Sequence, residues 1–538
     1  MWSSPLIRGV TAVILCIRSF AYEYTEPESL DVDHALTNLG ISPEEYCALL
    51  ASVFKTKTIP HGSPAIPEWT SSFWAAQQAA VTPFCIFQPS NSKEVAIAVL
   101  VSRRFGCSFA VKSGGHAAFA GASNVDGGIT IDLAQLNAIE LTRDRKIARV
   151  GTGNTWYQVY TALEADQLAV IGGRVADIGV GGLTLGGMMI IHSSSVSLSS
   201  YSYQNQGGIS FFSGSRGWAC DNVANYELVT AAGSILQVNR ESYPDLYWAL
   251  RGGGSNFGIV TRFDLETFPQ GPIWGGSRLY NATTYGSALI KAFVGFGNNP
   301  DEHAATWLSF AKFQGAMIMS ILLMHSTPVP DPPIFGAYKA IPSLTDTTKI
   351  RTLADLTVEV NSSNPKGLRE SYWMHTFKAD AQLIEFMTAT YLEEISPVQD
   401  VAGLEYPIAL QLITKETLLK MQRNGGNATP LPKEADEGPF LIMQLCPMWL
   451  ARQDDEAVIG SIVRIMDKVV ERAKEKGLYR EYIYMNYGSE YQDVLGSYGD
   501  ENYERLERIA KRYDPRGVFQ TLNKGYFKFG GSPKGSSL

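Results

Sequence analysis

The sequence predicts an α+β protein built in two parts, and two patterns along the chain indicate it. From about residue 83 to 270, short runs of strand-forming residues are separated by glycines, and helical stretches with apolar residues at 3.6-residue spacing lie between them. From 271 to about 478, strand-like runs mix with amphipathic helical stretches. The length of 538 residues leaves room for two or three domains with cores of their own.

Helices and strands are predicted along the whole chain. Pro43 opens a helix that runs to Phe54 within an otherwise helical N-terminal segment. Further helices are expected over Lys93–Phe105, Thr155–Leu168, Asp454–Lys476 and Glu501–Tyr513. Strands are expected over Ser108–Lys112, Gly128–Asp132, Ala148–Val150, Leu168–Ile171, Tyr226–Val229, Ile259–Phe263, Ala316–His325, Phe440–Pro447 and Tyr482–Tyr487.

The composition excludes several classes of protein. Hydrophobic residues make up 45% of the chain and charged residues 18%, which is enough apolar surface for folding and excludes global disorder. The 45 basic and 53 acidic residues give a net charge of −8, and neither sign forms a long block. A nucleic-acid partner is therefore not expected, and the expected partner is a small molecule.

The first 21 residues have the pattern of a secretory signal. Arg8 precedes an apolar run from Val10 to Ile17, and Ser19 and Ala21 place small residues at the −3 and −1 positions of a cleavage site. An apolar N-terminal strand or helix is the alternative. The run is shorter than the roughly 20 residues that span a bilayer, and no later segment is long and uncharged enough to do so. We therefore expect a secreted or secretory-pathway protein without a membrane span.

Cysteine and histidine usage agrees with this expectation. Cys16 lies in the predicted signal, and the other five cysteines form no Cys-x-x-Cys pair, so zinc ribbons and thioredoxin-type chemistry are not indicated. No two of the seven histidines have metal-ligand spacing, and no metal site is predicted. Glycosylation sequons stand at Asn281, Asn361 and Asn427, about as many as chance supplies, so they add little weight to a glycoprotein.

Three glycine-rich loops carry the expected chemistry: Lys-Ser-Gly-Gly-His at 112–116, Gly-Val-Gly-Gly-Leu-Thr-Leu-Gly-Gly at 179–187 and Arg-Gly-Gly-Gly-Ser-Asn-Phe-Gly at 251–258. Glycine is needed where backbone amides approach a pyrophosphate, because a Cβ atom would hold the main chain away. None of the loops fits G-x-G-x-x-G or the loop of nucleoside triphosphatases. Each loop alone is as compatible with a structural turn as with a ligand contact, and their joint occurrence is the stronger signal.

Three blocks of motifs resemble a known family. The first, Pro83 to Leu141, contains Ser-Gly-Gly-His at 113–116. The second includes Asp-Asn-Val at 221–223, and the tail contains Tyr-Met-Asn-Tyr at 484–487 and Tyr-Asp-Pro-Arg-Gly-Val-Phe at 513–519. These blocks resemble the FAD-binding domain of the vanillyl-alcohol oxidase and p-cresol methylhydroxylase (PCMH) superfamily. The tail resembles its berberine-bridge-enzyme-like branch, and within that branch the motifs are similar to those of fungal FAD-linked oxidases.

The resemblance implies a division of the chain. A two-part PCMH-type FAD-binding domain is expected beside an α+β substrate domain with an antiparallel sheet, and the C-terminal segment returns to the FAD domain. The expected boundaries are 1–21 for the signal peptide, 22–270 for the FAD-binding domain with its N-terminal helical segment, 271–480 for the substrate-binding domain and 481–538 for the C-terminal berberine-bridge-like element.

The resemblance also implies a covalent flavin. In the family the histidine of Ser-Gly-Gly-His bonds through a ring nitrogen to the C8-methyl carbon of the flavin, and here it is His116. Imidazole suits this role, because it is nucleophilic when neutral and its ordinary pKa near 6.5 leaves it mostly neutral. The cofactor-binding positions of the family fall on Lys112, Ser113, Gly114, Gly115, His116, Ile178, Gly179, Gly182, Gly186, Gly187, Asn222, Val229, Gly258, Val260 and Asn486.

Further positions take their expected roles from the family. Val175 stands where some relatives form a second flavin bond through cysteine, so a single attachment is expected. Ile178 falls where valine tends to admit oxygen and leucine to exclude it; isoleucine is β-branched like valine, which favours an oxidase over a dehydrogenase. Cys47 and Cys85 match positions that relatives join by a disulfide. The remaining cysteines, expected as buried thiols, are Cys107, Cys220 and Cys446.

Residues 188–207 interrupt the second glycine loop. In the family this loop leads directly to Ser-Phe-Phe-Ser-Gly, which stands here at 210–214, and removing 188–207 restores the pattern. The interruption contains no charged residue, and its ends can be encoded across intron boundaries. We therefore expect a translated retained intron. A genuine surface excursion is the alternative, since loops accept insertions readily.

Together these features predict an FAD-dependent oxidase. It would move hydride from a substrate C–H bond to covalent FAD, with reoxidation by molecular oxygen, in the tailoring of a fungal secondary metabolite. Tyr484 is the expected base, and alternation along the predicted strand would put Tyr482, Tyr484 and Asn486 on one face. A tyrosine, with its ordinary pKa near 10, needs a cationic or hydrogen-bonded neighbour for this role. Gln444 is expected to orient the substrate.

Two alternatives stay open at this point. A secreted carbohydrate (oligosaccharide) oxidase would use the same aromatic-rich composition to stack on sugars. A catalytically silent flavin-binding protein is favoured by the interruption of the second loop. In each case the expected protein is a monomer that uses no metal.

Overall fold

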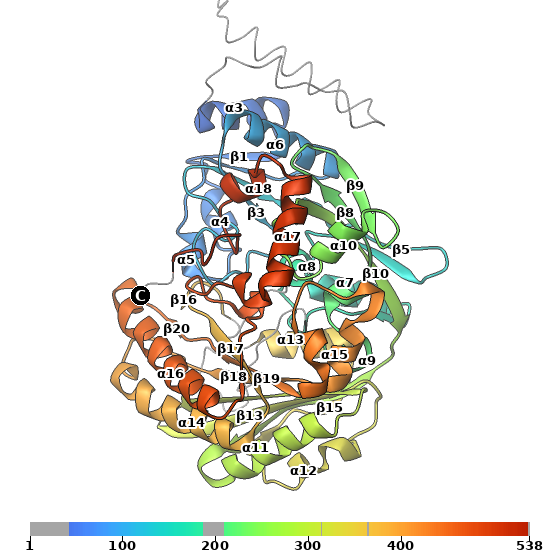
Figure 1. The fold of residues 1–538 in the computed structure, drawn as a ribbon. Coiled ribbons are helices and arrows are strands. Elements are labelled where there is room, and N and C mark those ends of the chain that lie inside the picture. Colours follow the sequence, from blue (N-terminus) through green and yellow to red (C-terminus); the bar gives the residue numbers. More distant parts are fainter. Residues whose placement is uncertain (1–41, 187–208, 314, 363–364, 536–538) are drawn as a thin grey trace, which may run out of the picture.

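The computed structural model describes residues 42–186, 209–313, 315–362 and 365–535, and its sheets fall into two groups (Figure 1). Two smaller sheets and their helices occupy the upper part of the view, and a nine-stranded sheet with its own helices occupies the lower part. The chain passes between the groups after β10 (Ile259–Pro269) and before β11 (Ile273–Asn281). The predicted α+β class with an antiparallel substrate-side sheet is confirmed.

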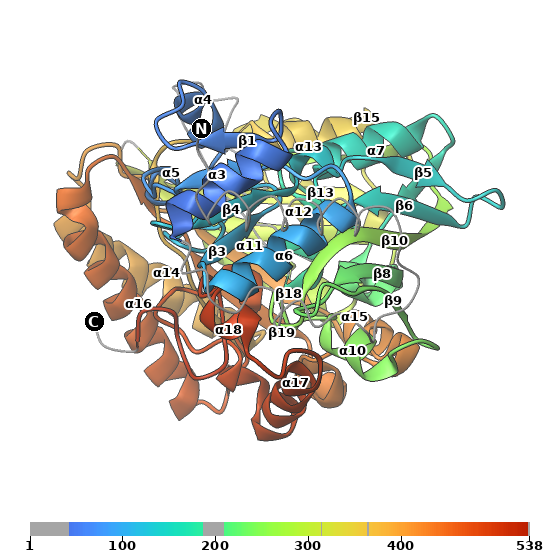
Figure 2. The ribbon, with the colours of Figure 1, turned by 90° about the horizontal axis from the view of Figure 1, so that it is seen from above.

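The first sheet is built mainly of parallel strands. Its order is β1 (Thr58–Pro60), β2 (Cys85–Phe87), β4 (Ile129–Asp132) and β3 (Phe109–Lys112), and only β1 runs antiparallel to its neighbour within this described sheet. Helices α3 (Pro43–Val53) and α6 (Ser92–Phe105) lie side by side over it (Figure 2). The Tyr46 hydroxyl on α3 donates a hydrogen bond to the Ala98 carbonyl on α6 at 2.9 Å.

Local sequence explains where these two helices begin and end. Ser42 and Glu45 form a capping box at the start of α3. The Asn91 side chain accepts from the amide of Glu94 at the start of α6, and α6 ends at Gly106, whose φ of +64° favours glycine. The helices expected at 43–54 and 93–105 are confirmed.

The second sheet is antiparallel. Its order is β5 (Ile139–Leu141), β6 (Ile147–Gly151), β10, β8 (Val223–Val229) and β9 (Ile235–Asn239), and β7 (Leu168–Val170) pairs with the end of β10. Helix α7 (Trp156–Glu164) begins with a capping box between Thr155 and Gln158 and buries Trp156 and Tyr160. Helix α10 (Pro244–Ala249) follows β9. These elements place the second and third glycine loops beside the first sheet.

The third sheet is antiparallel throughout its described strands. Helices α14 (Ala381–Ile395) and α16 (Asp455–Glu475) lie at its left side and lower left in Figure 1, and α11 (Ala282–Asn298) lies below it. Its order is β14 (Thr345–Asp346), β11, β13 (Ala316–His325), β12 (Ala304–Phe313), β18 (Ile408–Ile413), β19 (Phe440–Leu445), β17 (Trp373–Lys378) and β21 (Tyr479–Arg480), with β15 (Lys349–Arg351) also paired to β11.

The two faces of this third sheet belong to different cores, because side chains alternate along each strand. Leu308 and Leu441 pack into the core that includes α11, α14 and α16. Their neighbours Trp307 and Ile442 pack into the core shared with the second sheet and the tail. The inner face of the third sheet therefore forms one wall of the space between the two groups of elements.

The C-terminal segment returns to the upper part of the molecule, as expected. Helix α17 (Asp500–Tyr513) packs against α10 and crosses the upper part in Figure 1. The Tyr498 hydroxyl donates to the Gly252 carbonyl at 2.9 Å, and the Asn256 amide donates to the Phe527 carbonyl at 3.1 Å. The tail is thereby attached to the third glycine loop.

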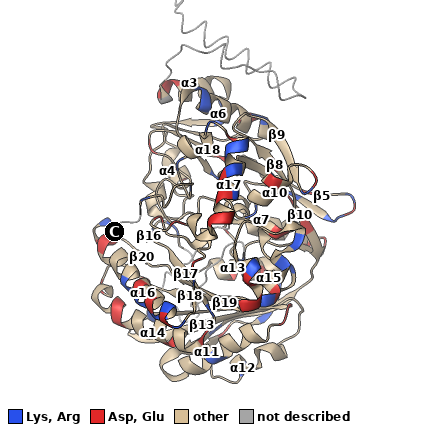
Figure 3. Cartoon of the chain, in the orientation of Figure 1, with Lys and Arg blue, Asp and Glu red and all other residues tan. Residues whose placement is uncertain are grey.

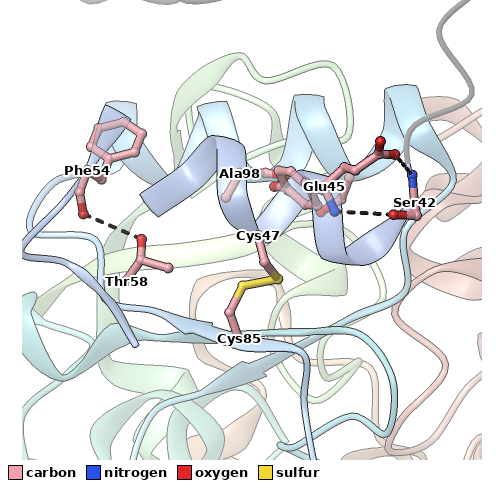
Figure 4. The surroundings of a disulfide bond; sticks show 9 residues. Ser42, Glu45, Cys47, Phe54, Thr58, Cys85 and Ala98 are labelled. Atoms are coloured by element: carbon pink, nitrogen blue, oxygen red, sulfur yellow. Dashed lines mark hydrogen bonds between the residues drawn. A yellow bond between two sulfur atoms is a disulfide. The ribbon is translucent and has the colours of Figure 1, made fainter. Parts of the chain in front are cut away.

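The expected disulfide is confirmed. Cys47 on α3 is bonded to Cys85 on β2 (Figure 4). Cys107, Cys220 and Cys446 are buried, as expected. A disulfide of this kind persists in oxidising compartments.

Two expectations about local structure are wrong. The N-terminal segment is not wholly helical, since β1 adds to the first sheet. Residues 482–487 form no strand: after β21 the chain turns through the 3-10 helix η8 (Met485–Tyr487), where the amide of Tyr487 donates to the carbonyl of Tyr484 at 2.9 Å. The alternation that placed Tyr482, Tyr484 and Asn486 on one face of a strand therefore does not apply.

Charged side chains of both signs are mixed on outer helices such as α16 and α17 (Figure 3). In the part of the chain that the structure describes, no helix combines the length and the apolar character needed to cross a membrane. No group of three metal-ligating side chains is found among the same residues.

Candidate functional site

The three glycine-rich loops meet around one pocket, which lies between the first and second sheets. The walls come from β3, the 3-10 helix η1 (Leu133–Gln135) after β4, the residue that follows β6, α8 (Val180–Leu185), the start of β10 and the tail. The lining residues are Val111, Ser113, Gly114, Gly115, His116, Ala122, Ser123, Leu133, Thr152, Ile178, Gly179, Gly181, Gly182, Leu185, Gly186, Gly254, Ser255, Gly258, Ile259, Val260, Asn523 and Tyr526. Ten of the expected cofactor-binding residues are in this set.

The first and second loops touch through their backbones. A Cβ atom on Gly179 would lie 2.4 Å from the Gly114 nitrogen, and one on Gly114 would lie 2.6 Å from the Gly179 nitrogen. The Ser113 hydroxyl donates to the Thr152 carbonyl at 2.7 Å and accepts from the Gly181 amide at 3.2 Å. Only glycine allows this approach, which leaves backbone amides rather than side chains at the pocket wall.

The third loop is joined to the second. The amides of Gly252 and Gly254 donate to the Leu185 carbonyl at 3.2 and 3.3 Å, and both glycines have positive φ, +105° and +67°. A Cβ atom on Gly186 would lie 2.4 Å from the Met485 sulfur, so the second loop also touches the tail. All three loops are thus held together by main-chain contacts, and the pocket has the character of a cradle for an anionic group.

His116 is a buried imidazole in the wall of this pocket. It is 3% exposed, lines the pocket, and packs edge-on against Trp74 with ring centres 5.6 Å apart. Neither ring nitrogen has a hydrogen-bond partner among the described residues. Burial, and then the charges of Lys366 and Lys112, hold the pKa of His116 well below its ordinary value. The imidazole is therefore neutral, and a neutral imidazole is nucleophilic.

Three of the expected cofactor-binding residues lie near the pocket but not in its described lining. The Lys112 ammonium lies 3.6 Å from a carboxylate oxygen of Asp132. The Asn222 amide donates to two backbone carbonyls and holds the turn before β8. The Val229 carbonyl faces Gly258, where a Cβ atom would approach it to 2.6 Å.

Asn486 and Gly187 complete the expected set. The Asn486 side-chain oxygen would lie 3.5 Å from a Cβ atom on Gly186, and neither of its amide atoms has a hydrogen-bond partner within the described residues. Buried polar atoms of this kind usually bond to a ligand or to water. Gly187, and the segment 188–207 with it, lies outside the described residues. Val175 is buried, and no cysteine is found in the described lining.

Tyr484 and Gln444 are not in the described lining of this pocket, and both are neighbours of Met374. The backbone amide of Tyr484 approaches the Met374 sulfur at 3.1 Å, and Met374 is the register partner of Gln444 in the pairing of β17 with β19. The Tyr484 ring packs against Trp218, with ring centres 4.8 Å apart. Because Tyr484 precedes Met485 and Asn486, which contact the second loop, it lies beside the cradle although it is not on a strand.

The hydroxyl of Tyr484 is a buried polar group that water does not reach. The residue is 2% exposed, and its hydroxyl has no hydrogen-bond partner among the described side chains and backbone groups. The Tyr482 hydroxyl and the Trp218 indole nitrogen also lack a hydrogen-bond partner among the described residues. Burial, and then Tyr487 and Cys220, raise the pKa of Tyr484 well above its ordinary value, whereas Arg174 lowers it. Three unsatisfied polar groups in one buried region indicate a substrate site.

The tail supplies lining residues that sequence reasoning missed. Asn523 and Tyr526 follow the last recognised motif, where no pattern marks a site. Tyr526 stacks on Phe119 with ring centres 6.1 Å apart, and it has a positive φ of +68°, which is rare for an aromatic residue. The positive φ of a residue other than glycine cannot be predicted from the sequence, so this feature of Tyr526 is seen only in the folded chain.

Lys528 was also missed. Its ammonium donates to the carbonyl and the hydroxyl of Ser255, each at 3.3 Å, and Ser255 lines the pocket. Burial lowers the pKa of Lys528 to about 7, and Asp514 opposes this effect. Residues 524–535 contain three lysines and four glycines, and nothing in this run distinguishes Lys528 from Lys524 or Lys534.

Comparisons with known proteins agree with the geometry. A family model described as an FAD-binding domain matches residues 83–198, and one described as berberine and berberine-like matches residues 483–523. The FAD-dependent monooxygenase tpcD of Cochliobolus heterostrophus is 38% identical over 486 residues, which cover 88% of this chain and 89% of that protein. The FAD-dependent monooxygenase FUP4 of Fusarium proliferatum is 37% identical over 473 residues, covering 85% and 87%.

Solved structures share the fold at low sequence identity. The 6-hydroxy-D-nicotine oxidase of Arthrobacter nicotinovorans matches with a TM-score of 0.70 and 19% identity, over 86% of this chain and 96% of that one. Berberine bridge enzyme from Eschscholzia californica matches with a TM-score of 0.67 and 17% identity, over 88% and 97%. From its pocket, its sequence motifs and these relatives, the chain belongs to the berberine-bridge-enzyme-like family of FAD-dependent oxidoreductases.

Proposed function

We propose that this enzyme is an oxidase that holds FAD covalently through His116 and oxidises an alcohol or amine-type carbon of a fungal secondary metabolite. The observation that carries the proposal is the pair of ring nitrogens on a neutral, buried His116, which have no hydrogen-bond partner among the described residues and stand in the wall of the glycine-loop pocket. The backbone cradle formed by Gly114 and Gly179 fits the pyrophosphate of the same cofactor.

The residues around Tyr484 suit the removal of a proton. Bound FAD supplies a hydride acceptor for the substrate C–H bond. In its ionised form, Tyr484 takes the proton of the substrate O–H group at its phenolic oxygen, so that the substrate loses one hydride and one proton and gains a C=O bond. Gln444, on the inner face of the third sheet, orients the oxygen that loses the proton. Trp218 and Tyr487 pack against Tyr484 and exclude water from it.

We propose molecular oxygen as the final electron acceptor, with hydrogen peroxide as its product. Ile178 is completely buried and lines the pocket, and its β-branched side chain is of the type that favours access for oxygen. A second candidate activity is monooxygenation, because the relatives tpcD and FUP4 are named FAD-dependent monooxygenases. Isotopically labelled oxygen distinguishes the two, since an oxidase leaves the label in peroxide and a monooxygenase transfers one labelled atom to the organic product.

The covalent bond is tested by acid precipitation. Wild-type protein should give a yellow pellet, and His116→Ala should release its flavin into the supernatant. His375→Ala is the matched control, because His375 is a partly buried imidazole, with its pKa lowered to about 4 by desolvation, but stands on β17 beside Tyr479. Its pellet should remain yellow. A colourless wild-type pellet would contradict the assignment of His116.

The substrate class is tested by screening for peroxide release. Metabolite extracts from fungal cultures should support turnover, and simple sugars and oligosaccharides should not; the reverse result would favour the carbohydrate oxidase. Yellow protein that no donor reduces would favour the silent flavoprotein. Tyr484→Phe should lower the rate of flavin reduction by about 10²–10⁴-fold with an unchanged flavin spectrum, and a rate within about threefold of wild type would remove Tyr484 from the mechanism.

We also propose that the enzyme is a secreted monomer cleaved after Ala21. The Cys47–Cys85 disulfide supports export, because such bonds persist in oxidising compartments. N-terminal sequencing of the protein from culture medium, together with its mass by light scattering, tests both statements.

A further inference from the structure

A buried cation stands near the proposed base. Arg174 lies in the loop between β7 and α8 and is 2% exposed. The centre of its guanidinium group lies 4.4 Å from the centre of the Trp307 ring, on the inner face of the third sheet. One of its nitrogens donates to the side-chain oxygen of Gln411 on β18 at 2.5 Å. Arg174 is therefore fixed by residues of the substrate-side sheet.

The contacts continue from Arg174 to Tyr484. The Gln411 amide nitrogen donates to the Tyr487 hydroxyl at 2.6 Å. The Tyr487 ring packs edge-on against Tyr484, with ring centres 4.9 Å apart and planes at 86°. All four residues are 2% exposed or less. A chain of two hydrogen bonds and one aromatic contact thus joins the guanidinium group to the tyrosine pair.

We propose that Arg174 is a positioning residue that stabilises the ionised form of Tyr484, acting by its charge on the tyrosine pair and held in place by Gln411 and Trp307. This inference rests on the proposed function, in which Tyr484 accepts the substrate proton. The ionised phenol takes the proton as the substrate O–H bond breaks, and it gives this proton up to water that enters the site once the product has left. Bound FAD would accept the hydride. Arg174 gains and loses no atom.

The physical need for such a cation follows from burial. Removing a phenolate from water disfavours its charged form, and a nearby opposite charge favours it. The titratable groups that face Tyr484 are Tyr487, Tyr482, Cys220 and Arg174. The first three are neutral at working pH, because burial raises the pKa of Cys220 and Tyr482 well above their ordinary values and that of Tyr487 to about 12.

Two further charged groups lie near this cluster in the described residues. Arg251 acts on Cys220 and on Asp221, and the other group is Asp221. It acts on Tyr482, and it is held by the Trp218 amide at 2.9 Å and the Asn427 side chain at 2.8 Å. Burial raises the pKa of Asp221 to about 6. Its negative charge opposes ionisation of a tyrosine, so Arg174 is the charged side chain that favours it. Arg174 lowers the pKa of Tyr484 and of Tyr487.

The test measures the ionisation of Tyr484 directly and needs no substrate. A 3,5-difluorotyrosine is incorporated at position 484 of the complete, flavin-loaded enzyme, and its ¹⁹F signal is followed as the pH is raised. Fluorine lowers the ordinary pKa of the phenol, which brings the titration into a range that the fold withstands. We expect Arg174→Gln to raise the titration midpoint by about one pH unit or more. Arg174→Lys, which keeps the charge, should raise it by less than half as much.

Two further results decide the inference. Gln411→Met removes the group that holds the guanidinium, and it should also raise the titration midpoint, by less than Arg174→Gln does. If Arg174→Gln does not fold, as judged by its flavin spectrum, the result for Gln411→Met tests the inference instead. A midpoint that stays at the wild-type value in a folded Arg174→Gln or Gln411→Met enzyme overturns the proposal. Acid precipitation and the rate of Tyr484→Phe test the proposed function separately, so failure of one is distinguishable from failure of the other.

Discussion

Gly179→Ala tests whether the contact between the first and second loops is required for cofactor binding. Gly179 has an ordinary φ of −71°, so alanine meets no backbone strain there. Its Cβ atom, however, would lie 2.4 Å from the Gly114 nitrogen and 2.7 Å from its Cα atom, where ordinary contact begins at 3.4 Å. The neighbours are backbone atoms that cannot rotate away, and the two loops must separate by about 1 Å.

The expected cost has two parts. Overpacking of this kind lowers the free energy of unfolding by about 1–3 kcal/mol. Separation of the loops also moves backbone amides away from the cofactor phosphates, and each hydrogen bond to a charged group is worth about 1.5–3 kcal/mol. Loss of a single such bond weakens FAD binding by about tenfold or more. We therefore expect a lower melting temperature and a reduced flavin content in the same variant.

The assay compares thermal unfolding and the ratio of flavin to protein absorbance in the purified enzymes. Gly271→Ala is the matched control, because Gly271 is exposed, has no positive φ, and a Cβ atom there would meet nothing within 4 Å. It should leave both quantities unchanged. If Gly179→Ala also keeps the wild-type melting temperature and flavin content, the two loops do not form the close contact on which the cradle depends.

Three further predictions concern stability and the interrupted loop. Cys47→Ser opens the disulfide, whose cysteines are 38 residues apart, and should lower the free energy of unfolding in urea by about 3–4 kcal/mol; equal urea midpoints for wild type and variant would contradict this. Because burial lowers the pKa of Lys528 to about 7, against about 10.4 when unfolded, the unfolded chain binds more protons between these values and stability should rise with pH across them. Lys528→Met should lose that rise in melting temperature, and a rise of the same size in the variant would assign it to other groups. Deleting 188–207 should give a protein that holds at least as much FAD as the full chain; a lower flavin content would show that the segment belongs to the working enzyme.

The cofactor site was predictable because its chemistry is local. Only glycine allows main chains to approach each other or a phosphate as closely as they do at Gly114, Gly179 and Gly254. A cluster of glycines can therefore be recognised from the sequence alone. His116 follows Gly114 and Gly115 in the sequence, and its role was predicted through the family resemblance. The pairing of Cys47 with Cys85 was reachable only through the family resemblance, since five cysteines beyond the signal leave many pairings open.

The tail shows where local reading fails. The alternation in Tyr482–Tyr487 is typical of a strand, yet β21 ends at Arg480 and the chain closes a 3-10 turn instead. The buried tyrosines of this irregular segment show the same alternation as the residues of a strand. The pattern therefore does not distinguish a strand from a buried loop. Tyr484 lies beside the predicted site for a reason other than the one its sequence pattern suggested.

The sequence by itself determined the α+β class, the glycine cradle, the histidine in its wall and the pair of cysteines that the family joins. Only the tertiary structure brought Arg174, Gln411 and Tyr487 together, from positions more than 70 residues apart, and placed Asn523 and Tyr526 in the pocket. The physical reason is that a glycine contact or a nucleophilic imidazole depends on the residue itself, whereas the ionisation of a buried tyrosine depends on which charge the fold brings near it.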